Sequence, residues 1–378
     1  MTRVLLAPDK FQGTLTAAEV SAHLERGLRS MRPDLEVEVV PVSDGGDGLL
    51  QVARQVGYDL VPVRAAGPTG EAGPATYAVR GGAAVIELAE VCGLARLPGG
   101  RRAPGTATSR GLGEVVAAAL DAGCRRLLVG IGGSASTDGG AGVLSALGAR
   151  VLDADARPLP DGGAALARVA SLDLSGLHGT LRDAEVVVAC DVDNVLTGPG
   201  GAAAVYGPQK GATPAQVQTL DAALVRWADV VAEEIGRDLR DTPGAGAAGG
   251  VGFGLYAGLG AALRPGTEVV QELTGLAQAV ARADLVVTGE GSLDEQTRHG
   301  KAPAGVAALA RAAGVPVVAV AGRVLLGADA LAAAGIGAAF ALVDEADHER
   351  QALEDPGPLL ARIGARIAAD LPGRVDRR

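Results

Sequence analysis

The stretch at residues 284–303, "DLVVTGEGSLDEQTRHGKAP", joins a short apolar run to a loop of glycines and charged side chains. A short apolar run bounded by glycine is typical of a strand that is buried on both faces. The residues after it include Glu290, Asp294, His299 and Lys301, whose side chains bind metals, accept protons or neutralise anions. The stretch therefore predicts a strand followed by a loop whose side chains are suited to catalysis or ligand binding.

Comparable apolar runs recur along the chain and alternate with segments of helical periodicity. One such segment begins with Thr16, followed three residues later by Glu19, which is the spacing of an N-terminal capping box. Strands that alternate with helices indicate an α/β fold with largely parallel sheets. The other predicted strands are "RVLLAP" (3–8), "VEVVPV" (37–42), "AAVIEL" (83–88), "RRLLVGIG" (125–132), "EVVVAC" (185–190), "VPVVAVAG" (315–322) and "AAFALV" (338–343).

Four predicted strands end in loops that are rich in glycine and acidic residues. In an open α/β sheet, ligands bind beyond the carboxyl ends of the strands, so we expect these loops to face one ligand site. The loops are "SDGGDG" (43–48), "GGSASTDGG" (132–140), "DVDN" (191–194) and "GEGSLDE" (289–295). The agreement among the four carries more weight than any single loop.

The chain length favours two domains, because 378 residues exceed the size of one average domain. Stretches rich in Pro and Gly near residues 70 and 245 suggest crossings between domains, and the strands after residue 280 resemble the first ones. We therefore expect a discontinuous Rossmann-like domain formed by residues 1–66 plus 276–378. Residues 67–275 would form an inserted α/β domain, with the active site in the cleft between the two domains.

Composition limits the class of partner. The chain has 34 Lys and Arg against 44 Asp and Glu, a formal net charge of −10 that would repel nucleic acid and anionic membranes.

Cys92, Cys124 and Cys190 are widely spaced in apolar contexts, which favours buried free thiols over a disulfide or a zinc site. The first residues lack the apolar core of a signal peptide, and the longest apolar region is interrupted by charges. We expect a cytoplasmic protein.

The loop after residue 130 fits a dinucleotide-binding fingerprint by letter. Gly130, Gly132 and Ala135 have the G-x-G-x-x-A spacing, and Asp153 closes the next apparent strand. The fingerprint requires a helix N-terminus that receives a pyrophosphate. Asp138 lies close to where that diphosphate would bind, so the loop favours a phosphate or metal site, and an NAD-dependent dehydrogenase of a small hydroxy acid remains the alternative.

Other motifs and classes are less well supported. The segment around Gly300 and Lys301 does not have P-loop spacing, because Glu295 stands in the place of the first glycine. No G-x-S-x-G nucleophile elbow follows a strand. A non-catalytic sensor of hydroxy acids would need a partner or DNA surface, and the acidic composition with no basic recognition helix counts against it.

Seven motifs together resemble those of the bacterial type I glycerate kinase family, the glycerate 2-kinases. They occur in the order and with the separations of that family, and the resemblance runs along nearly the full chain. The motifs are "APDKFQGTLTA", "VSDGGDG", "GIGGSASTDGGAG", "CDVDN", "GPGGAAAVYGPQKGA", "PGAGAAGGVG" and "TGEGSLDEQTRHGKAP". Gln12 departs from the pattern, because the family usually has a lysine there.

The resemblance implies a two-domain glycerate kinase I fold, with a Rossmann or flavodoxin-like parallel-sheet domain and a second α/β domain inserted in the chain. It also implies transfer of the γ-phosphoryl group of ATP to D-glycerate with Mg²⁺, giving ADP and 2-phosphoglycerate in preference to 3-phosphoglycerate. The reaction would serve glyoxylate and glycerate metabolism. The expected partners are the two small molecules, with a homodimer as the candidate assembly.

Phosphoryl transfer requires cations on the transferring oxygens and a carboxylate near the attacking hydroxyl, and the loops contain both. We predict charge-neutralising roles for the three lysines of the chain, and Asp44 or Asp138 as the proton acceptor. The catalytic candidates are thus Asp44, Asp138, Lys10, Lys210 and Lys301. The metal candidates are Asp191, Asp193 and Asp294. The candidates for substrate or nucleotide binding are Gly45, Gly46, Asp47, Gly132, Gly133, Ser134, Gly249, Gly250, Gly289, Glu290, Gly291 and His299.

Overall fold

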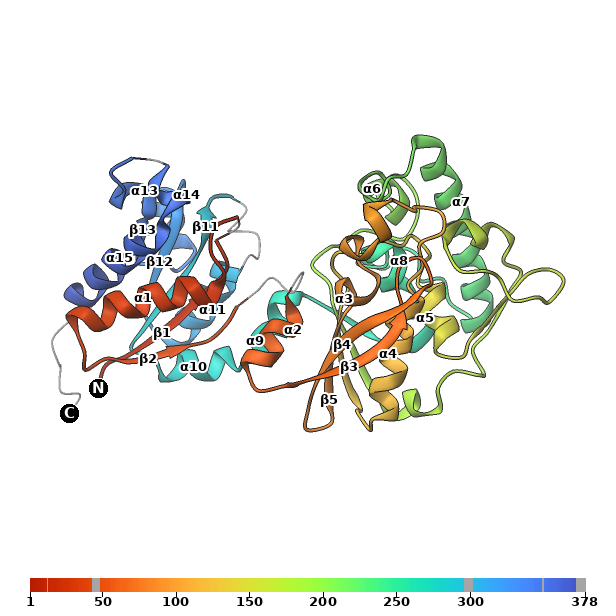
Figure 1. Cartoon of the computed structure of the whole chain (residues 1–378), viewed down its shortest axis with the longest axis horizontal. Coiled ribbons are helices and arrows are strands. Elements are labelled where there is room, and N and C mark those ends of the chain that lie inside the picture. Colours follow the sequence, from red (N-terminus) through yellow and green to blue (C-terminus); the bar gives the residue numbers. More distant parts are fainter. Residues whose placement is uncertain (12, 43–47, 296–301, 349, 372–378) are drawn as a thin grey trace. The chain divides into compact units, whose positions relative to one another are not determined.

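A computed structural model describes residues 1–11, 13–42, 48–295, 302–348 and 350–371. The chain divides into two compact units, which Figure 1 shows coloured along the sequence. Unit 1 combines Met1–Asp44 with Thr267–Arg378, and unit 2 is Gly45–Gly266. The sequence boundaries at residues 66 and 276 differ from this division. The reason at the first boundary is that strand β3 (Asp59–Ala66) pairs along its whole length with β4 (Ala72–Arg80) of unit 2.

Unit 1 is built on a parallel five-stranded sheet with the order β13-β12-β11-β1-β2. Numbered within the unit, this is the order 2-1-3-4-5 of flavodoxin-like folds, as predicted. Each predicted apolar run of this unit contains a strand. The central strands β1 and β11 are largely buried, whereas the edge strand β2 is largely exposed. The strands are β1 (Arg3–Pro8), β2 (Glu36–Val39), β11 (Leu285–Leu293), β12 (Val317–Val324) and β13 (Ala338–Ala341).

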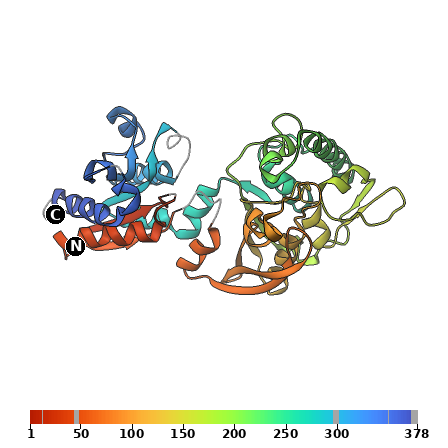
Figure 2. The ribbon, with the colours of Figure 1, turned by 45° about the horizontal axis from the view of Figure 1, so that its top comes forward.

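The alternation of side chains along β1 builds two apolar layers in unit 1. Leu5 belongs to one apolar cluster with residues of α10 (Leu276–Arg282) and α11 (Ala302–Ala313). Leu6 belongs to another with residues of α1 (Ala17–Met31) and α15 (Pro356–Asp370). Helices α1 and α15 lie side by side (Figures 1 and 2). The remaining helices are α9 (Gly266–Thr274), which begins at the unit boundary, α12 (Ala328–Ala333), α13 (Leu342–Glu345) and α14 (Gln351–Glu354).

The first helix begins as the sequence predicts. The Thr16 hydroxyl accepts the backbone N–H of Glu19 at 3.3 Å, and the Glu19 carboxylate accepts the backbone N–H of Thr16 at 2.8 Å. Further along α1, Gly27 permits close packing on α15, because a Cβ there would lie 2.0 Å from the carbonyl oxygen of Ala361.

Unit 2 contains a mixed six-stranded sheet with the order β10-β9-β6-β5-β4-β3, in which β3, β4 and β5 are antiparallel neighbours and the rest are parallel. The stretch "AAGPTGEAGPA" near residue 70 is the turn and flanks of the β3–β4 hairpin, so it does not cross between domains. The remaining strands of this sheet are β5 (Ala83–Glu87), β6 (Arg126–Gly130), β9 (Glu185–Ala189) and β10 (Ala262–Arg264). A separate antiparallel pair is formed by β7 (Arg150–Leu152) and β8 (Ser171–Asp173).

Helices pack around this sheet in two further apolar clusters. Helix α4 (Arg110–Asp121) packs with β5 and β6, and α7 (Pro214–Ile235) carries Trp227, which is fully buried. The other α-helices are α2 (Leu49–Gln55), α3 (Ala89–Cys92), α5 (Ala141–Ala146), α6 (Ala202–Tyr206) and α8 (Ala247–Phe253). Short turns of other helix types are η1 (Leu94–Arg96), η2 (Pro98–Gly100), η3 (Gly163–Arg168), η4 (Gly179–Asp183), η5 (Pro208–Lys210) and η6 (Gly254–Gly258).

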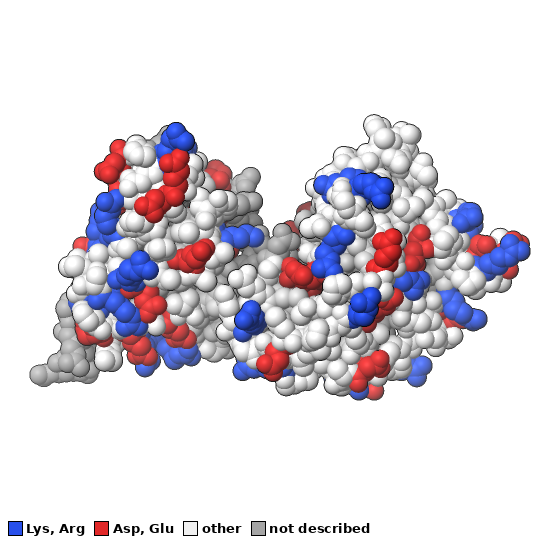
Figure 3. Space-filling model, viewed as in Figure 1, with Lys and Arg blue, Asp and Glu red and all other residues white. Residues whose placement is uncertain are grey.

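The described residues include no helix with the length and apolar character that crossing a bilayer requires. All three cysteines carry free thiols, and Cys92 and Cys124 are buried. On the face shown in Figure 3, acidic and basic side chains are interspersed over each unit.

Candidate active site

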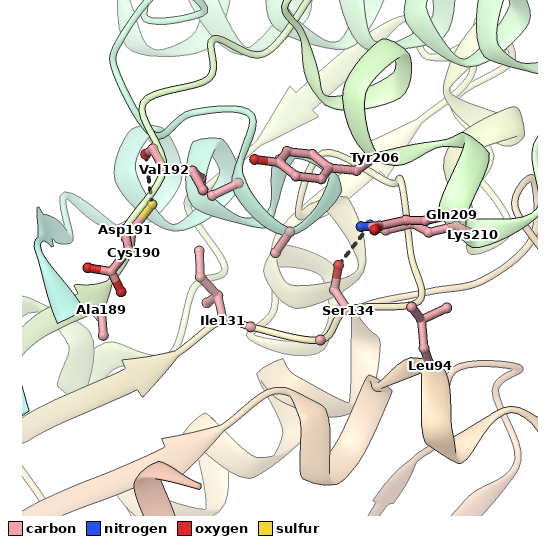
Figure 4. A pocket seen from close by; sticks show the side chains of 14 residues that line it. Leu94, Ile131, Ser134, Ala189, Cys190, Asp191, Val192, Tyr206, Gln209 and Lys210 are labelled. Carbon is pink, nitrogen blue, oxygen red and sulfur yellow. Dashed lines mark hydrogen bonds between the residues drawn. The ribbon is translucent and has the colours of Figure 1, made fainter. Parts of the chain in front are cut away.

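A pocket of about 200 Å³ lies at the carboxyl ends of β6 and β9 in unit 2 (Figure 4). Residues Ile131 to Ser134 after β6 and Ala189 to Val192 at the end of β9 form two of its walls. Tyr206, Gln209 and Lys210 come from α6 and η5. The remaining lining residues are Leu94, Ala247 and Ala248. The two predicted loops "GGSASTDGG" and "DVDN" thus meet here, because Gly130 and Ala189 are register partners in the parallel β6–β9 pair.

The loop after β6 stays non-helical until α5 begins at Ala141. The dinucleotide fingerprint needs a helix that starts within the glycine motif, so its structural condition is not met. Asp153, the expected ribose ligand, instead accepts the backbone N–H groups of Asp155 and Arg157 at 2.9 Å each. The dehydrogenase alternative therefore loses both of its supporting features.

Lys210 is a buried cation at the wall of the pocket. Its side chain is 2 % exposed, and its Nζ donates to Ser134 Oγ at 2.7 Å and to the carbonyl oxygen of Ser136. Burial lowers the pKa of Lys210 to about 7, and the negative charge of Asp138 opposes that shift. The sequence predicted a charge-neutralising role for Lys210, and the structure brings Lys210 together with Gly132, Gly133 and Ser134 on one pocket.

The lowered pKa of Lys210 predicts a stability that depends on pH. Between about 7 and the ordinary lysine value of 10.5, the unfolded chain retains a proton that the folded protein has released. The free energy of unfolding should therefore rise with pH across this window, by up to about 1.4 kcal/mol per unit. We expect urea unfolding between about pH 7.5 and about pH 9.5 to show this rise, with a smaller slope in Lys210→Met. Equal slopes in both proteins would contradict the assignment.

Asp138 lies behind the pocket and does not line it. Its side chain is 1 % exposed, and Oδ2 accepts the backbone N–H and the hydroxyl of Ser109 at 2.8 Å each. The other oxygen, Oδ1, accepts the backbone N–H of Gly140 at 3.3 Å. Burial raises the pKa of Asp138, and the hydrogen bonds oppose that shift. This carboxylate joins the start of α4 to the loop before α5.

The glycine-rich segment near residue 245 lies inside unit 2 and supports the loop that carries Asp138. Gly249 has a φ of +74°, and a Cβ there would lie 2.1 Å from the carbonyl oxygen of Ser136 and 2.8 Å from Lys210 Nζ. Gly250, with a φ of +89°, approaches Gly139 in the same way, and the Gly139 N–H donates to the Gly249 carbonyl at 3.0 Å. Gly249 and Gly250 therefore pack against the loop that contains Ser136 and Gly139 and do not line the pocket. Ala247 and Ala248 form part of the pocket wall.

The metal candidates of unit 2 follow β9. Asp191 and Asp193 are both exposed, and Asp191 Oδ1 accepts the backbone N–H of Gly266 at 2.8 Å. Nearby, Asn194 Oδ1 accepts the Tyr206 hydroxyl at 2.6 Å. The described residues contain no cluster of three or more His, Cys, Asp or Glu side chains with metal-binding geometry. One or two carboxylates at a pocket fit Mg²⁺, which keeps several waters and shares substrate phosphates.

The candidates of unit 1 gather at the carboxyl ends of β1 and β11, which are neighbours in the sheet. Lys10 follows β1 and is exposed, and the backbone N–H of Asp9 donates to the carbonyl of Gly289 at 2.8 Å. The strand order reverses between β1 and β11, which is where ligands bind in doubly wound folds.

The glycines of β11 serve close strand packing. A Cβ on Gly289 would lie 2.1 Å from the carbonyl oxygen of Val320 on β12. Glu290 is 8 % exposed, Gly291 is partly buried, and Asp294 follows the end of the strand. Asp294 belongs to unit 1, whereas Asp191 and Asp193 belong to unit 2.

Six predicted site residues and Gln12 lie outside the described residues. The six are Asp44, Gly45, Gly46, Asp47, His299 and Lys301. Their roles stay predictions, as does the location of the site between two domains.

Sequence reasoning missed several residues at the pocket and beside it. Tyr206, Gln209 and Cys190 line the pocket. Glu87 at the end of β5 is 4 % exposed and accepts the backbone N–H groups of Gly48 (2.8 Å) and Leu50 (3.1 Å) at the start of α2. A charged residue that closes an apolar strand was the signal for Glu87, and Tyr206 and Gln209 stand within the motif quoted for Lys210.

The fold is that of an α/β protein with a pocket at the carboxyl ends of parallel strands, which is where open α/β sheets bind ligands. The sequence pattern of the Glycerate kinase family matches residues 4–372. The chain is 43% identical over 372 residues to the "Glycerate kinase" of Bacillus subtilis (strain 168), covering 98% of this chain and 97% of the relative. It is 39% identical over 373 residues to the "Glycerate 2-kinase" of Escherichia coli (strain K12), covering 98% of each.

A solved structure agrees with these relatives. The crystal structure of a protein provisionally assigned as glycerate kinase 2 from Salmonella typhimurium LT2 matches with a TM-score of 0.87 and 41% identity, covering 97% of each chain. The chain belongs to the glycerate kinase family. It is accordingly a kinase, an enzyme of phosphoryl transfer.

Proposed function

We propose that this chain transfers the γ-phosphoryl group of ATP to D-glycerate, forming ADP and 2-phosphoglycerate. The observation that carries the proposal is the buried Lys210 cation at a pocket formed by strand-end loops. A cation in a water-poor site stabilises the negative charge of a carboxylate or a transferring phosphoryl group. The relative named "Glycerate 2-kinase" supports the position of the product phosphate.

The proposed roles follow from what phosphoryl transfer requires. The protein supplies positioning and charge stabilisation, with little covalent chemistry of its own. We assign charge neutralisation to Lys210, with Lys10 and Lys301 as further cations. Of the two candidate proton acceptors, Asp138 is buried against Ser109 and does not line the pocket, which favours Asp44.

The same proposal includes Mg²⁺ as the metal of the reaction. Asp191, which lines the pocket, and Asp193 would hold it, with Asp294 as a further candidate ligand. When bound, Mg²⁺ neutralises charge on phosphate oxygens. Asp191 is already oriented by its hydrogen bond from the Gly266 backbone. We further propose a cytoplasmic location, which the free thiols favour, and a homodimer as the assembly.

An assay with three arms tests this function. ADP release from Mg·ATP is measured with D-glycerate, with L-glycerate and with no acceptor, and phosphorus NMR determines the position of the phosphate on the product. We expect release with D-glycerate only, and a signal for the 2-phosphate. A 3-phosphate signal would overturn the regiochemistry. If folded protein releases no ADP in any arm, the proposal of D-glycerate as acceptor fails.

A further inference from the structure

The contact between Lys210 and Ser134 determines which way the serine hydroxyl can donate. A protonated lysine has three donors and no acceptor. Ser134 Oγ must therefore accept from Lys210 Nζ, at 2.7 Å, and its own proton is available to a different acceptor. The second contact of Nζ, with the carbonyl oxygen of Ser136, also requires Nζ to donate.

The residues around Ser134 leave its hydroxyl proton free to form a hydrogen bond in the pocket. Ser134 lines the pocket between Gly133 and the loop that runs behind it, and Figure 4 shows its side chain reaching toward Lys210. Among the described residues, the Ser134 hydroxyl makes no contact with an acceptor of its own. A hydroxyl in this position can donate to a ligand, and the adjacent buried cation favours a ligand with negative charge.

We propose that the Ser134 hydroxyl donates a hydrogen bond to an anionic oxygen of the bound reactant, and that Lys210 determines this direction. The inference deepens the proposed function, on which it rests, by naming the group that the pocket recognises. The oxygen belongs either to the carboxylate of the acceptor or to a phosphoryl group of the nucleotide, and the test distinguishes the two.

A second consequence concerns pH. When Lys210 loses its proton, Nζ gains a lone pair and becomes an acceptor for the Ser134 hydroxyl, so the hydroxyl turns away from the ligand. Nζ can still donate to the Ser136 carbonyl in that state. Because the pKa of Lys210 is lowered to about 7, this change falls within a pH range in which binding can be measured. The other titratable groups near Lys210 or on the same pocket are Asp138, Asp191, Cys190 and Tyr206.

Equilibrium titration of the unchanged protein and two Ser134 variants tests the inference. Calorimetric dissociation constants for D-glycerate, ADP and inorganic phosphate are measured from about pH 6 to about pH 9 in the unchanged protein, Ser134→Ala and Ser134→Thr. We expect Ser134→Ala to weaken one class of probe by about tenfold or more at the low end, which is the contribution of a hydrogen bond to a charged group. Glycerate alone would identify the carboxylate, and ADP with phosphate would identify the phosphoryl group.

The pH series isolates the role of Lys210. Ionisation of the probe itself cancels in the ratio of dissociation constants between Ser134→Ala and the unchanged protein at each pH. We expect this ratio to fall toward one as pH rises through about 7. Ser134→Thr keeps a hydroxyl and should retain the unchanged protein's affinity, and Ser171→Ala, an exposed serine on β8, is the matched control with unchanged affinity.

Three outcomes would each overturn the inference. In the first, Ser134→Ala binds all probes like the unchanged protein; in the second, the ratio of dissociation constants does not change with pH. In the third, Ser134→Thr loses affinity although it unfolds at the same temperature as the unchanged protein. Failure of the proposed function has a different signature. In that case the unchanged protein releases no ADP with D-glycerate, while phosphate binding and its dependence on Ser134 are still measurable.

Discussion

Lys210→Met is expected to lower kcat by about two to three orders of magnitude without unfolding the protein. Methionine has a similar length, so it fills the buried space but provides no charge to the pocket. Removing one preorganised group that stabilises charge in the transition state typically costs this much. Replacing a buried cation by an apolar side chain is often neutral or stabilising, so the melting temperature should be retained or raised.

Steady-state kinetics and thermal unfolding are measured on the same preparation to separate the two effects. Arg182→Met is the matched control, because Arg182 is an exposed cation of unit 2 that lies outside the pocket. It should leave kcat and KM unchanged. Activity of Lys210→Met within a few-fold of the unchanged protein would remove Lys210 from the catalytic residues.

Gly249→Ala is expected to lower the free energy of unfolding by at least about 3 kcal/mol and to reduce activity. Gly249 has a φ of +74°, which alanine adopts only with strain. Its new Cβ would also lie 2.1 Å from the Ser136 carbonyl oxygen and 2.8 Å from Lys210 Nζ. Both neighbours belong to the buried contact that supports the pocket, so the loop or the lysine must move.

Gly260→Ala provides the comparison, because Gly260 has a φ of +68° but nothing lies within 4 Å of its Cβ position. Strain alone should cost about 1 kcal/mol there, with full activity. Urea unfolding of both variants measures the difference. Equal destabilisation would show that the contact with Ser136 and Lys210 adds nothing beyond backbone strain.

The fold class could be predicted because strands buried on both faces need continuous apolar runs. All the predicted runs became strands, and the loops after β6 and β9 meet at one pocket. Strand β3 of the β3–β4 hairpin was missed because it lies at the edge of its sheet and exposes half of its residues. Strand β3 also contains Pro62 and Arg64, which weaken an apolar pattern. Its turn, rich in Gly and Pro, resembles a linker in composition.

Gly132, Gly133 and Ser134, which were predicted from one short motif, line the pocket, and their binding role stays a prediction. Asp138 shows the limit of that reasoning. Its glycine-rich context suggested access for a hydroxy acid, whereas the structure surrounds the carboxylate with the hydrogen-bond donors of Ser109. Whether a carboxylate faces solvent or a buried helix start depends on packing between segments that are far apart in the sequence.

The sequence by itself determined the alternation of strands and helices, the loops at the strand ends and the lysine in its glycine-rich frame, because these features depend on local periodicity and turn chemistry. Tertiary structure alone decided that Lys210 is buried and that its partner is Ser134, 76 residues earlier in the chain. The reason is physical: the pKa of an ammonium group and the direction of a hydroxyl depend on desolvation and on neighbouring atoms, and both arise only when distant segments pack together.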